Sequence, residues 1–322
     1  MHIGITLRNV GTTLGLHRGK STSKDNNKSH KRFAEVYLQE IERRRRMVSS
    51  STIENELTAY RSFLAFAGHG FLVCELTSDH VLRYERWLRD RGVSPNTSAC
   101  YMRSLRAVTN RLGLNGSALF QEVRTAKDKT EKKAVNAKTI QKIMAAKVPD
   151  GSFLALARDA FLFSIMAMGI PFVDLAHLKK SNLRDGDIVY NRRKTGRRVA
   201  VKIEPCMQEI INRYNDPTSP YLFPLLTETE PAKAETEYKR LIGRYNRALK
   251  RLCIVSCVKT RVTSYTARHT WATLAYKMGM VLAYISKALG HASPVTTQNY
   301  LKDIDDEGLF NANKVLIGKI FK

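Results

Sequence analysis

Three residue types in the C-terminal third of the chain could together attack a phosphate ester. Arg268 lies in Tyr-Thr-Ala-Arg-His, His291 follows Leu-Gly, and Tyr300 comes nine residues after His291. A phenol is a weak nucleophile at its ordinary pKa of roughly 10, so it needs help from neighbouring groups. A guanidinium and an imidazole can give that help and can neutralise the charge that grows on phosphate oxygens during attack.

This pattern resembles the tyrosine recombinase, or phage integrase, family, in which His-x-x-Arg is followed by Leu-Gly-His and then by a tyrosine. The resemblance covers most of residues 136–300. It implies that Tyr300 attacks DNA and takes the 3′-phosphate, that Arg268 clamps the scissile phosphate, and that His291 donates to the same phosphate. The phosphotyrosyl link stores the energy of the broken bond, so the resemblance implies no ATP, metal or other cofactor.

The same resemblance gives roles to two further residues. Lys194 matches a lysine on a β-hairpin that protonates the leaving 5′-oxygen. The alternative for Lys194 is a turn residue in solvent. Tyr265 stands three residues before Arg268, where the family usually has histidine. A phenol can donate a hydrogen bond there but is a poorer proton shuttle near pH 7.

One position departs from the family. Its first catalytic arginine belongs to Gly-x-Arg-x-x-Glu/Asp, whereas this chain reads Gly-Ile-Pro-Phe-Val-Asp, with Pro171 at the arginine position and Asp174 retained. Losing one such donor typically costs about 3–4 kcal/mol. Arg158, a cation in an otherwise apolar helix, is the candidate replacement, and its alternative is a surface residue near the start of that helix.

The charge of the chain indicates an anionic partner. Lys and Arg number 54 against 29 Asp and Glu, which gives +25 and favours nucleic acid. The charge alone does not exclude a ribosome-associated protein or a peripheral membrane protein. The sequence contains no apolar run of about 18 residues, which is the length that would predict a membrane span. The five scattered cysteines fit reduced thiols in the cytoplasm better than a zinc site.

The apolar spacing predicts a mainly α (α+β) protein with two domains. We expect a flexible basic tail at 1–30, a helical core-binding DNA domain at 31–123, a linker at 124–135 and the catalytic domain with a C-terminal docking helix at 136–322. A small antiparallel meander is expected over residues 182–203. Its second turn would carry Lys194.

Two basic clusters are expected to contact DNA phosphates, which position a protein without specifying sequence. The first is the run Arg43, Arg44, Arg45 and Arg46, and the second is Arg193 with Arg197 on the hairpin. A solvated basic face is the alternative for the first cluster.

These observations predict a site-specific DNA recombinase that exchanges strands in sequence through a Holliday junction. The resemblance implies a homotetramer on two synapsed sites, double-stranded DNA with short inverted repeats, and an accessory DNA-bending protein, in the cytoplasm at the bacterial nucleoid. The length favours a DNA invertase over a mobile-element integrase, because it leaves no room for a large arm-binding domain. Two rivals are a catalytically weakened DNA-binding descendant, suggested by Pro171 and Tyr265, and a type IB topoisomerase-like enzyme.

Overall fold

The computed structural model describes residues 30–126, 128, 134–291 and 297, and the chain divides into two compact units, Met1–Thr130 and Glu131–Lys322. The predicted tail, Tyr300 and the predicted docking helix lie outside the described residues. In the described part of the chain, no helix combines the length and apolarity needed to cross a membrane.

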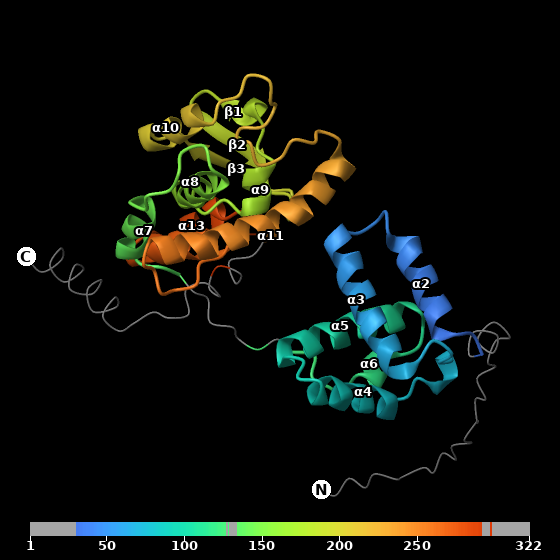
Figure 1. The fold of residues 1–322 in the computed structure, drawn as a ribbon. Helices are drawn as coiled ribbons and strands as arrows, with labels where there is room; N and C mark the ends of the chain where they lie inside the picture. Colours follow the sequence, from blue (N-terminus) through green and yellow to red (C-terminus); the bar gives the residue numbers. More distant parts are fainter. Residues whose placement is uncertain (1–29, 127, 129–133, 292–296, 298–322) are drawn as a thin grey trace, which may run out of the picture. The chain divides into compact units, whose positions relative to one another are not determined.

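The first unit is a helical bundle (Figure 1). Its elements are α2 (Phe33–Arg44), α3 (Ser50–Ala67), η1 (Val73–Glu75), α4 (Ser78–Asp90), α5 (Pro95–Arg111) and α6 (Gly116–Leu119). Local capping sets two of the helix starts, because the hydroxyls of Thr77 and Ser94 accept the backbone N–H groups of His80 and Thr97. Aromatic rings then join the helices.

Phe63 lies at the centre of that aromatic packing. Its ring centroid is 5.1 Å from that of Phe33 on α2 and 5.2 Å from that of Tyr84 on α4, the second pair edge-to-face at 84°. Such tilted contacts add to the apolar area that each ring buries. The packing therefore ties α2, α3 and α4 to one core.

The second unit combines helices with a small sheet, which confirms the predicted fold class. Its elements are α7 (Ala137–Met144), α8 (Phe153–Met166), α9 (Phe172–Ala176), η2 (Lys180–Asn182), β1 (Leu183–Arg184), β2 (Asp187–Asn191), β3 (Arg198–Lys202), α10 (Pro205–Arg213), α11 (Pro231–Val255), α12 (Thr266–Lys277) and α13 (Leu282–Ala288). The three strands form an antiparallel meander in the order β1-β2-β3.

The apolar helix α8 lies in the core of this unit and packs against α11 and α12. Ser152 caps it by accepting the N–H of Ala155. The ring of Phe172 on α9 stacks on Tyr245 of α11 at 3.7 Å, which holds α9 against the long helix that runs along one side of the unit (Figure 1).

The β2–β3 hairpin has one buried and one exposed face. Ile188 pairs with Val201 and Tyr190 with Val199, and all four are buried, whereas Ala200 and Lys202 are exposed. Because strand side chains alternate between faces, the next inward position after residues 188 and 190 is residue 192. The turn that follows β2 therefore carries one side chain into the interior.

Candidate active site

Arg268, in the first turn of α12, lies at the centre of a buried polar cluster. It is 1% exposed, and its Nη1 donates to the carbonyl oxygen of Gly169 at 3.0 Å. Its Nη2 donates to the carbonyl oxygen of Leu289 and lies 3.1 Å from Nε2 of His291. The structure thus brings together two of the residues that the sequence predicts for one site, Arg268 and His291.

Gly169 is required for this arrangement on two grounds. Its φ is +71°, a region that other residues rarely adopt, and a Cβ at this position would lie 3.0 Å from Cα of Arg268. The segment that carries the retained Asp174 therefore approaches Arg268 closely because residue 169 has no side chain.

His291 is held at both ring nitrogens. A guanidinium only donates, so Nε2 accepts from Arg268, and this assigns the proton to Nδ1, which lies 2.8 Å from Oγ1 of Thr297. Thr297 is fully buried and precedes Tyr300 by three residues in the sequence. The imidazole is therefore fixed in one orientation.

The turn between β2 and β3 holds the backbone around His291. Nη1 of Arg197 donates to the carbonyl oxygen of His291 at 2.6 Å, and Oγ1 of Thr195 donates to that of Gly290 at 3.3 Å. Arg197, predicted to contact DNA, thus also positions the histidine.

A second arginine, Arg192, lies in this cluster and was not among the residues predicted from sequence. It is 6% exposed, its Nε is 2.8 Å from Oδ2 of Asp174, and its Nη1 donates to the carbonyl oxygen of Leu289. The signal that could have found it is the strand alternation, which points residue 192 to the same side as Ile188 and Tyr190.

Asp174 is the carboxylate that organises this side of the cluster. Besides Arg192, its Oδ1 accepts the backbone N–H of Arg193 at 2.9 Å. Burial raises the pKa of Asp174, because the charged form loses water, while the N–H of Arg193 and the charges of Arg192 and Arg268 act in the opposite direction.

The other predicted residues of this region lie at the surface. Lys194 is exposed in the hairpin turn. Tyr265 is 46% exposed just before α12, with its ring edge-to-face on His269 at 4.7 Å. Arg193 is exposed as well, and its Nη2 lies 3.3 Å from Glu235.

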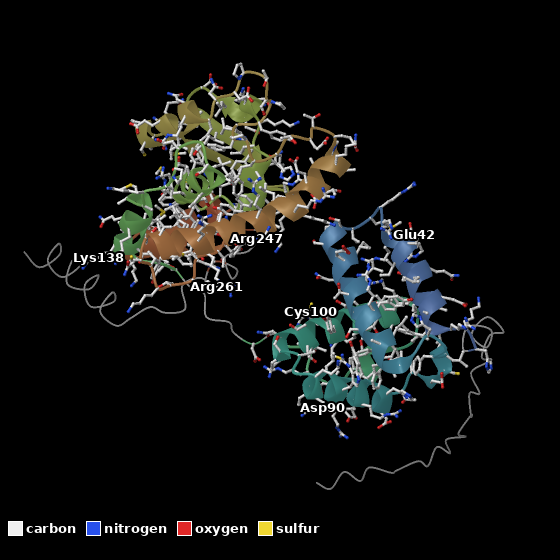
Figure 2. The ribbon with its side chains drawn as sticks, viewed as in Figure 1. Glu42, Asp90, Cys100, Lys138, Arg247 and Arg261 are labelled. Atoms are coloured by element: carbon white, nitrogen blue, oxygen red, sulfur yellow. The ribbon has the colours of Figure 1, made fainter. Side chains whose placement is uncertain are left out.

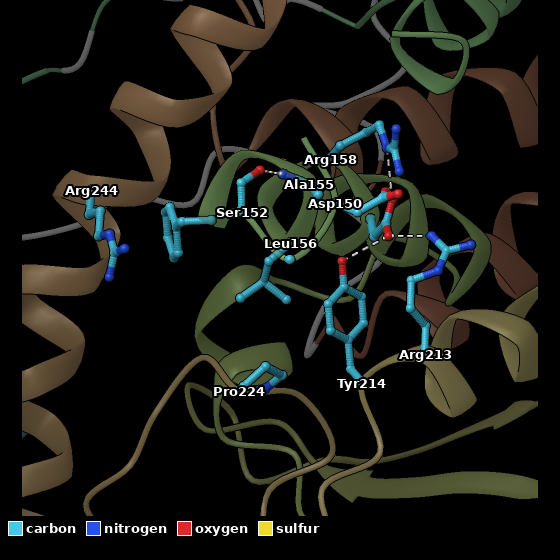
Figure 3. Close-up of a pocket in the computed structure, with 12 residues that line it drawn as sticks. Asp150, Ser152, Ala155, Leu156, Arg158, Arg213, Tyr214, Pro224 and Arg244 are labelled. Carbon is cyan, nitrogen blue, oxygen red and sulfur yellow. Dashed lines mark hydrogen bonds and ion pairs between the residues drawn. The ribbon is translucent and has the colours of Figure 1, made fainter. Parts of the chain in front are cut away.

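The structure does not bring Arg158 into the cluster. Its Nε donates to Asp159 and its Nη1 to the carbonyl oxygen of Ala146. Asp159 also accepts hydrogen bonds from Arg213 and Tyr214, which are labelled with Arg158 in Figure 3. Gly169 follows the C-terminal end of α8, whereas Arg158 lies near its start. At about 1.5 Å of rise per residue, roughly 12 Å of helix separates Arg158 from that end.

A hollow of about 290 Å³ lies beside His291. The cations that line it are Arg197, Arg198 and Lys287. A phosphate group of a polyanion fits this lining, because the positive side chains stand next to the buried donors of the cluster. Among the described residues, no three His, Cys, Asp or Glu side chains are grouped as metal ligands.

The arginine run of the first unit makes more internal contacts than predicted. Arg43 binds Glu40 through two hydrogen bonds of 2.9 Å, and Arg44, with a side chain 19% exposed, lies 3.0 Å from the buried Glu56. Arg45 pairs with exposed Glu42, and Arg46 is exposed. Arg44 therefore helps to hold the domain together. Only Arg43, Arg45 and Arg46 of the run are exposed to solvent.

Both units of the chain match known protein families. Residues 133–307 match the phage integrase family, and residues 32–111 match the phage integrase SAM-like domain. The chain is 26% identical over 257 residues to tyrosine recombinase XerA of Pyrococcus furiosus, covering 77% of this chain and 84% of that protein. It is 24% identical over 259 residues to tyrosine recombinase XerC of Rickettsia canadensis, covering 77% and 84%.

Solved structures share the fold. A lambda integrase dimer bound to a COC′ core site aligns with a TM-score of 0.65 at 17% identity, covering 91% of this chain and 84% of that one. The Tn1549 transposon integrase with transposon right end DNA aligns with a TM-score of 0.63 at 14% identity, covering 91% and 100%. Since the family match spans residues 133–307, more than half of the 322 residues, the chain belongs to the phage integrase family of tyrosine recombinases.

Proposed function

We propose that this protein cuts and rejoins double-stranded DNA at specific sites through a covalent bond to Tyr300. The observation that carries the proposal is the buried pair of Arg268 and His291, whose hydrogen bonds continue to Thr297, three residues before Tyr300. Buried, fixed donors stabilise a developing phosphate charge with little reorganisation at the moment of reaction.

The reaction exchanges one ester for another. The phenol oxygen of Tyr300 bonds to the scissile phosphorus, the bond to the 5′-oxygen breaks, and the DNA 3′-phosphate stays on the tyrosine. Nε2 of His291 takes the proton of the Tyr300 phenol and, in place of its contact with Arg268, donates to the phosphate. Arg268 donates to a non-bridging oxygen of the same phosphate, and Lys194 on the exposed turn gives a proton to the leaving oxygen. Rejoining reverses these steps with a 5′-hydroxyl from another strand, so the bond energy is conserved.

Duplex binding is assigned to basic surfaces in both units. On α11, Arg240, Arg244, Arg247 and Arg251 are three or four residues apart and exposed, so they form one ridge. Arg247, and Arg261 in the loop after α11, are labelled in Figure 2. The guanidinium of Arg244 lies 3.7 Å over the ring of Phe153, which orients this part of the ridge.

Arginines elsewhere extend the proposed duplex contacts. Arg43, Arg45 and Arg46 in the first unit are exposed, as are Arg193 and Arg197 on the hairpin. Phosphate contacts of this kind fix the register of a protein on DNA, and they weaken as salt concentration rises.

The proposed assembly is a homotetramer that joins two DNA sites and passes through a Holliday junction. A lambda integrase tetramer bound to a Holliday junction, which aligns with this chain at a TM-score of 0.64 and 16% identity, supports it. Short inverted repeats, an accessory DNA-bending protein and a place at the nucleoid in the cytoplasm belong to the same proposal. The proposal covers both inversion and integration, and the genes beside the target sites would separate the two.

Covalent capture tests the proposed function without knowledge of the target. Wild-type protein is mixed with a pool of duplexes that carry a randomised segment and nicks at varied positions. A nick lets the cleaved fragment diffuse away, so the covalent intermediate accumulates. Protein-linked DNA is recovered after denaturation and sequenced. We expect enriched sequences with wild type and none with Tyr300→Phe.

The same experiment separates the rival functions. A DNA-binding descendant without activity would give no adduct with wild type while still shifting duplexes on a gel. A topoisomerase-like enzyme would give adducts without sequence enrichment and would relax plasmids that lack the captured sequence. Either result contradicts a site-specific recombinase.

A further inference from the structure

The segment that carries Pro171 contacts a guanidinium from another element. Pro171 is the N-cap of α9, and Asp174 lies in the first turn of that helix. The carboxylate of Asp174 holds Nε of Arg192 at 2.8 Å. The segment that lacks an arginine at position 171 is therefore in contact, through Asp174, with a cation supplied by the residue that follows β2.

Arg192 also contacts the segment that precedes His291. Its Nη1 donates to the carbonyl oxygen of Leu289, the same atom that accepts from Nη2 of Arg268. Two guanidinium groups that share one acceptor lie next to each other. Like charges in such proximity repel each other unless an anion lies between them or beside them.

The contacts of Arg192 leave one nitrogen available. Nε and Nη1 face Asp174 and Leu289, and Nη2 makes no hydrogen bond to any of the residues that the structure describes. Asp174 is the one described carboxylate in contact with Arg192, and it also feels the charges of Arg268 and Arg193. The cluster thus holds more positive than negative charge, which suits an anionic ligand.

The packing around Arg192 fixes its side chain. A Cβ on Gly290 would lie 2.9 Å from Cγ of Arg192, so the adjacent segment leaves space for this arginine only because residue 290 is glycine. Backbone hydrogen bonds also fix its position, since its N–H donates to Arg197 at 2.8 Å. A guanidinium held in this way can bind a phosphate without losing much conformational freedom.

We propose that Arg192 is a catalytic residue that binds the scissile phosphate beside Arg268, in place of the arginine missing at position 171. Asp174 is then a positioning residue that aims it. This inference rests on the proposed function, because it requires that the cluster binds a DNA phosphodiester. It predicts that the contribution of Arg192 depends on the negative charge of that phosphate.

The test uses one duplex recovered by wild-type capture, in two forms. One form has an ordinary phosphate at the mapped cleavage position, and the other has a methylphosphonate, in which a methyl group replaces a charged oxygen. Adduct formation is timed for wild type, Arg192→Ala and Arg192→Lys. On the ordinary phosphate we expect Arg192→Ala to be about 100-fold slower, because one donor to the developing charge is lost. On the methylphosphonate the same variant should be less than about 10-fold slower.

Arg213→Ala is the matched control, since it also removes an arginine from a buried aspartate, Asp159, outside this cluster. It should form adducts at the wild-type rate on both duplexes. If Arg192→Ala does not fold, Arg192→Lys is measured instead. Its loss of rate relative to wild type should likewise be smaller on the methylphosphonate than on the ordinary phosphate.

The outcomes separate this inference from the proposed function. If wild type captures no DNA beyond Tyr300→Phe, both are overturned. If wild type captures DNA but Arg192→Ala keeps its rate on the ordinary phosphate, only the inference is overturned. An equal defect of Arg192→Ala on both duplexes would mean that the arginine only supports the fold, which also overturns the inference.

Discussion

Arg192 and Arg268 donate hydrogen bonds to the same backbone oxygen, that of Leu289, although 76 residues separate the two arginines in the chain (268 − 192). The shared acceptor joins the hairpin, α12 and the segment that carries His291 into one polar cluster.

Asp174→Ala should destabilise the second unit strongly. The change leaves Arg192 buried without its carboxylate, and breaking a buried ion pair in this way costs roughly 3–5 kcal/mol. The side chains of Arg192 and Asp174 are 7% and 1% exposed, so water cannot replace the lost carboxylate as a partner of the guanidinium. The free energy of unfolding is measured in urea by the fluorescence of Trp271, with Trp87→Phe in the background. A loss below 1 kcal/mol would contradict a buried ion pair here.

Gly290→Ala should lower the free energy of unfolding by more than the strained backbone conformation of residue 290 alone would, because the new side chain meets Arg192. The added Cβ would lie 2.9 Å from Cγ of Arg192 and 3.2 Å from Val199. Overpacking of this kind costs about 1–3 kcal/mol. Gly196→Ala is the matched control, because its φ of +68° is similar to the +60° of Gly290 but nothing lies within 4 Å. Equal losses of unfolding free energy in the two variants would rule out the steric clash.

Thr297→Val should lower the rate of adduct formation about 10-fold. Valine keeps the shape of threonine but removes the oxygen that accepts from Nδ1 of His291 at 2.8 Å, and an unsatisfied buried donor costs about 1–3 kcal/mol. Thr297→Ser keeps the hydroxyl and should stay close to the wild-type rate. Equal rates for the valine and serine variants would show that this hydrogen bond does not orient the imidazole.

Glu56→Gln should destabilise the first unit by about 3 kcal/mol. Its carboxylate, 6% exposed, pairs with Arg44 and Arg111, which come from α2 and α5. Urea unfolding is followed by Trp87 in a Trp271→Phe background. Glu42→Gln is the control, since Glu42 pairs with Arg45 at the surface and should cost at most about 0.5 kcal/mol. Equal effects would mean that the buried network contributes no more than a surface pair.

Arg247→Ala should weaken binding of the captured duplex without changing stability. Loss of one phosphate contact reduces the slope of log affinity against log salt by about 1 and affects all sequences alike. Affinity is measured by fluorescence anisotropy over a series of salt concentrations. Arg213→Ala, whose side chain is 53% exposed but lies outside the ridge, should leave the slope unchanged. An unchanged slope for Arg247→Ala would remove it from the DNA surface.

The sequence by itself determined the family pattern, the meander and the approximate positions of most helices among the described residues. Residue types that favour helix starts through local hydrogen bonds and backbone preference precede three of these helices, and the structure has α5, α7 and α8 begin directly after Ser94, Asn136 and Ser152. The meander was predictable because Asp185-Gly186 favours a tight turn between alternating strands. The roles of Lys194, Tyr265 and Tyr300 stay predictions.

Only the tertiary structure decided which arginine joins Arg268. The sequence predicted Arg158 as the replacement because it is a cation in an apolar helix. In the structure its charge is balanced by its neighbour Asp159. Arg192 looked like one of several basic residues in a turn, yet it meets Asp174, 18 positions earlier in the chain (192 − 174). An ion pair depends on distance in space, and that distance is set by the packing of α9, the hairpin and α12 rather than by local sequence.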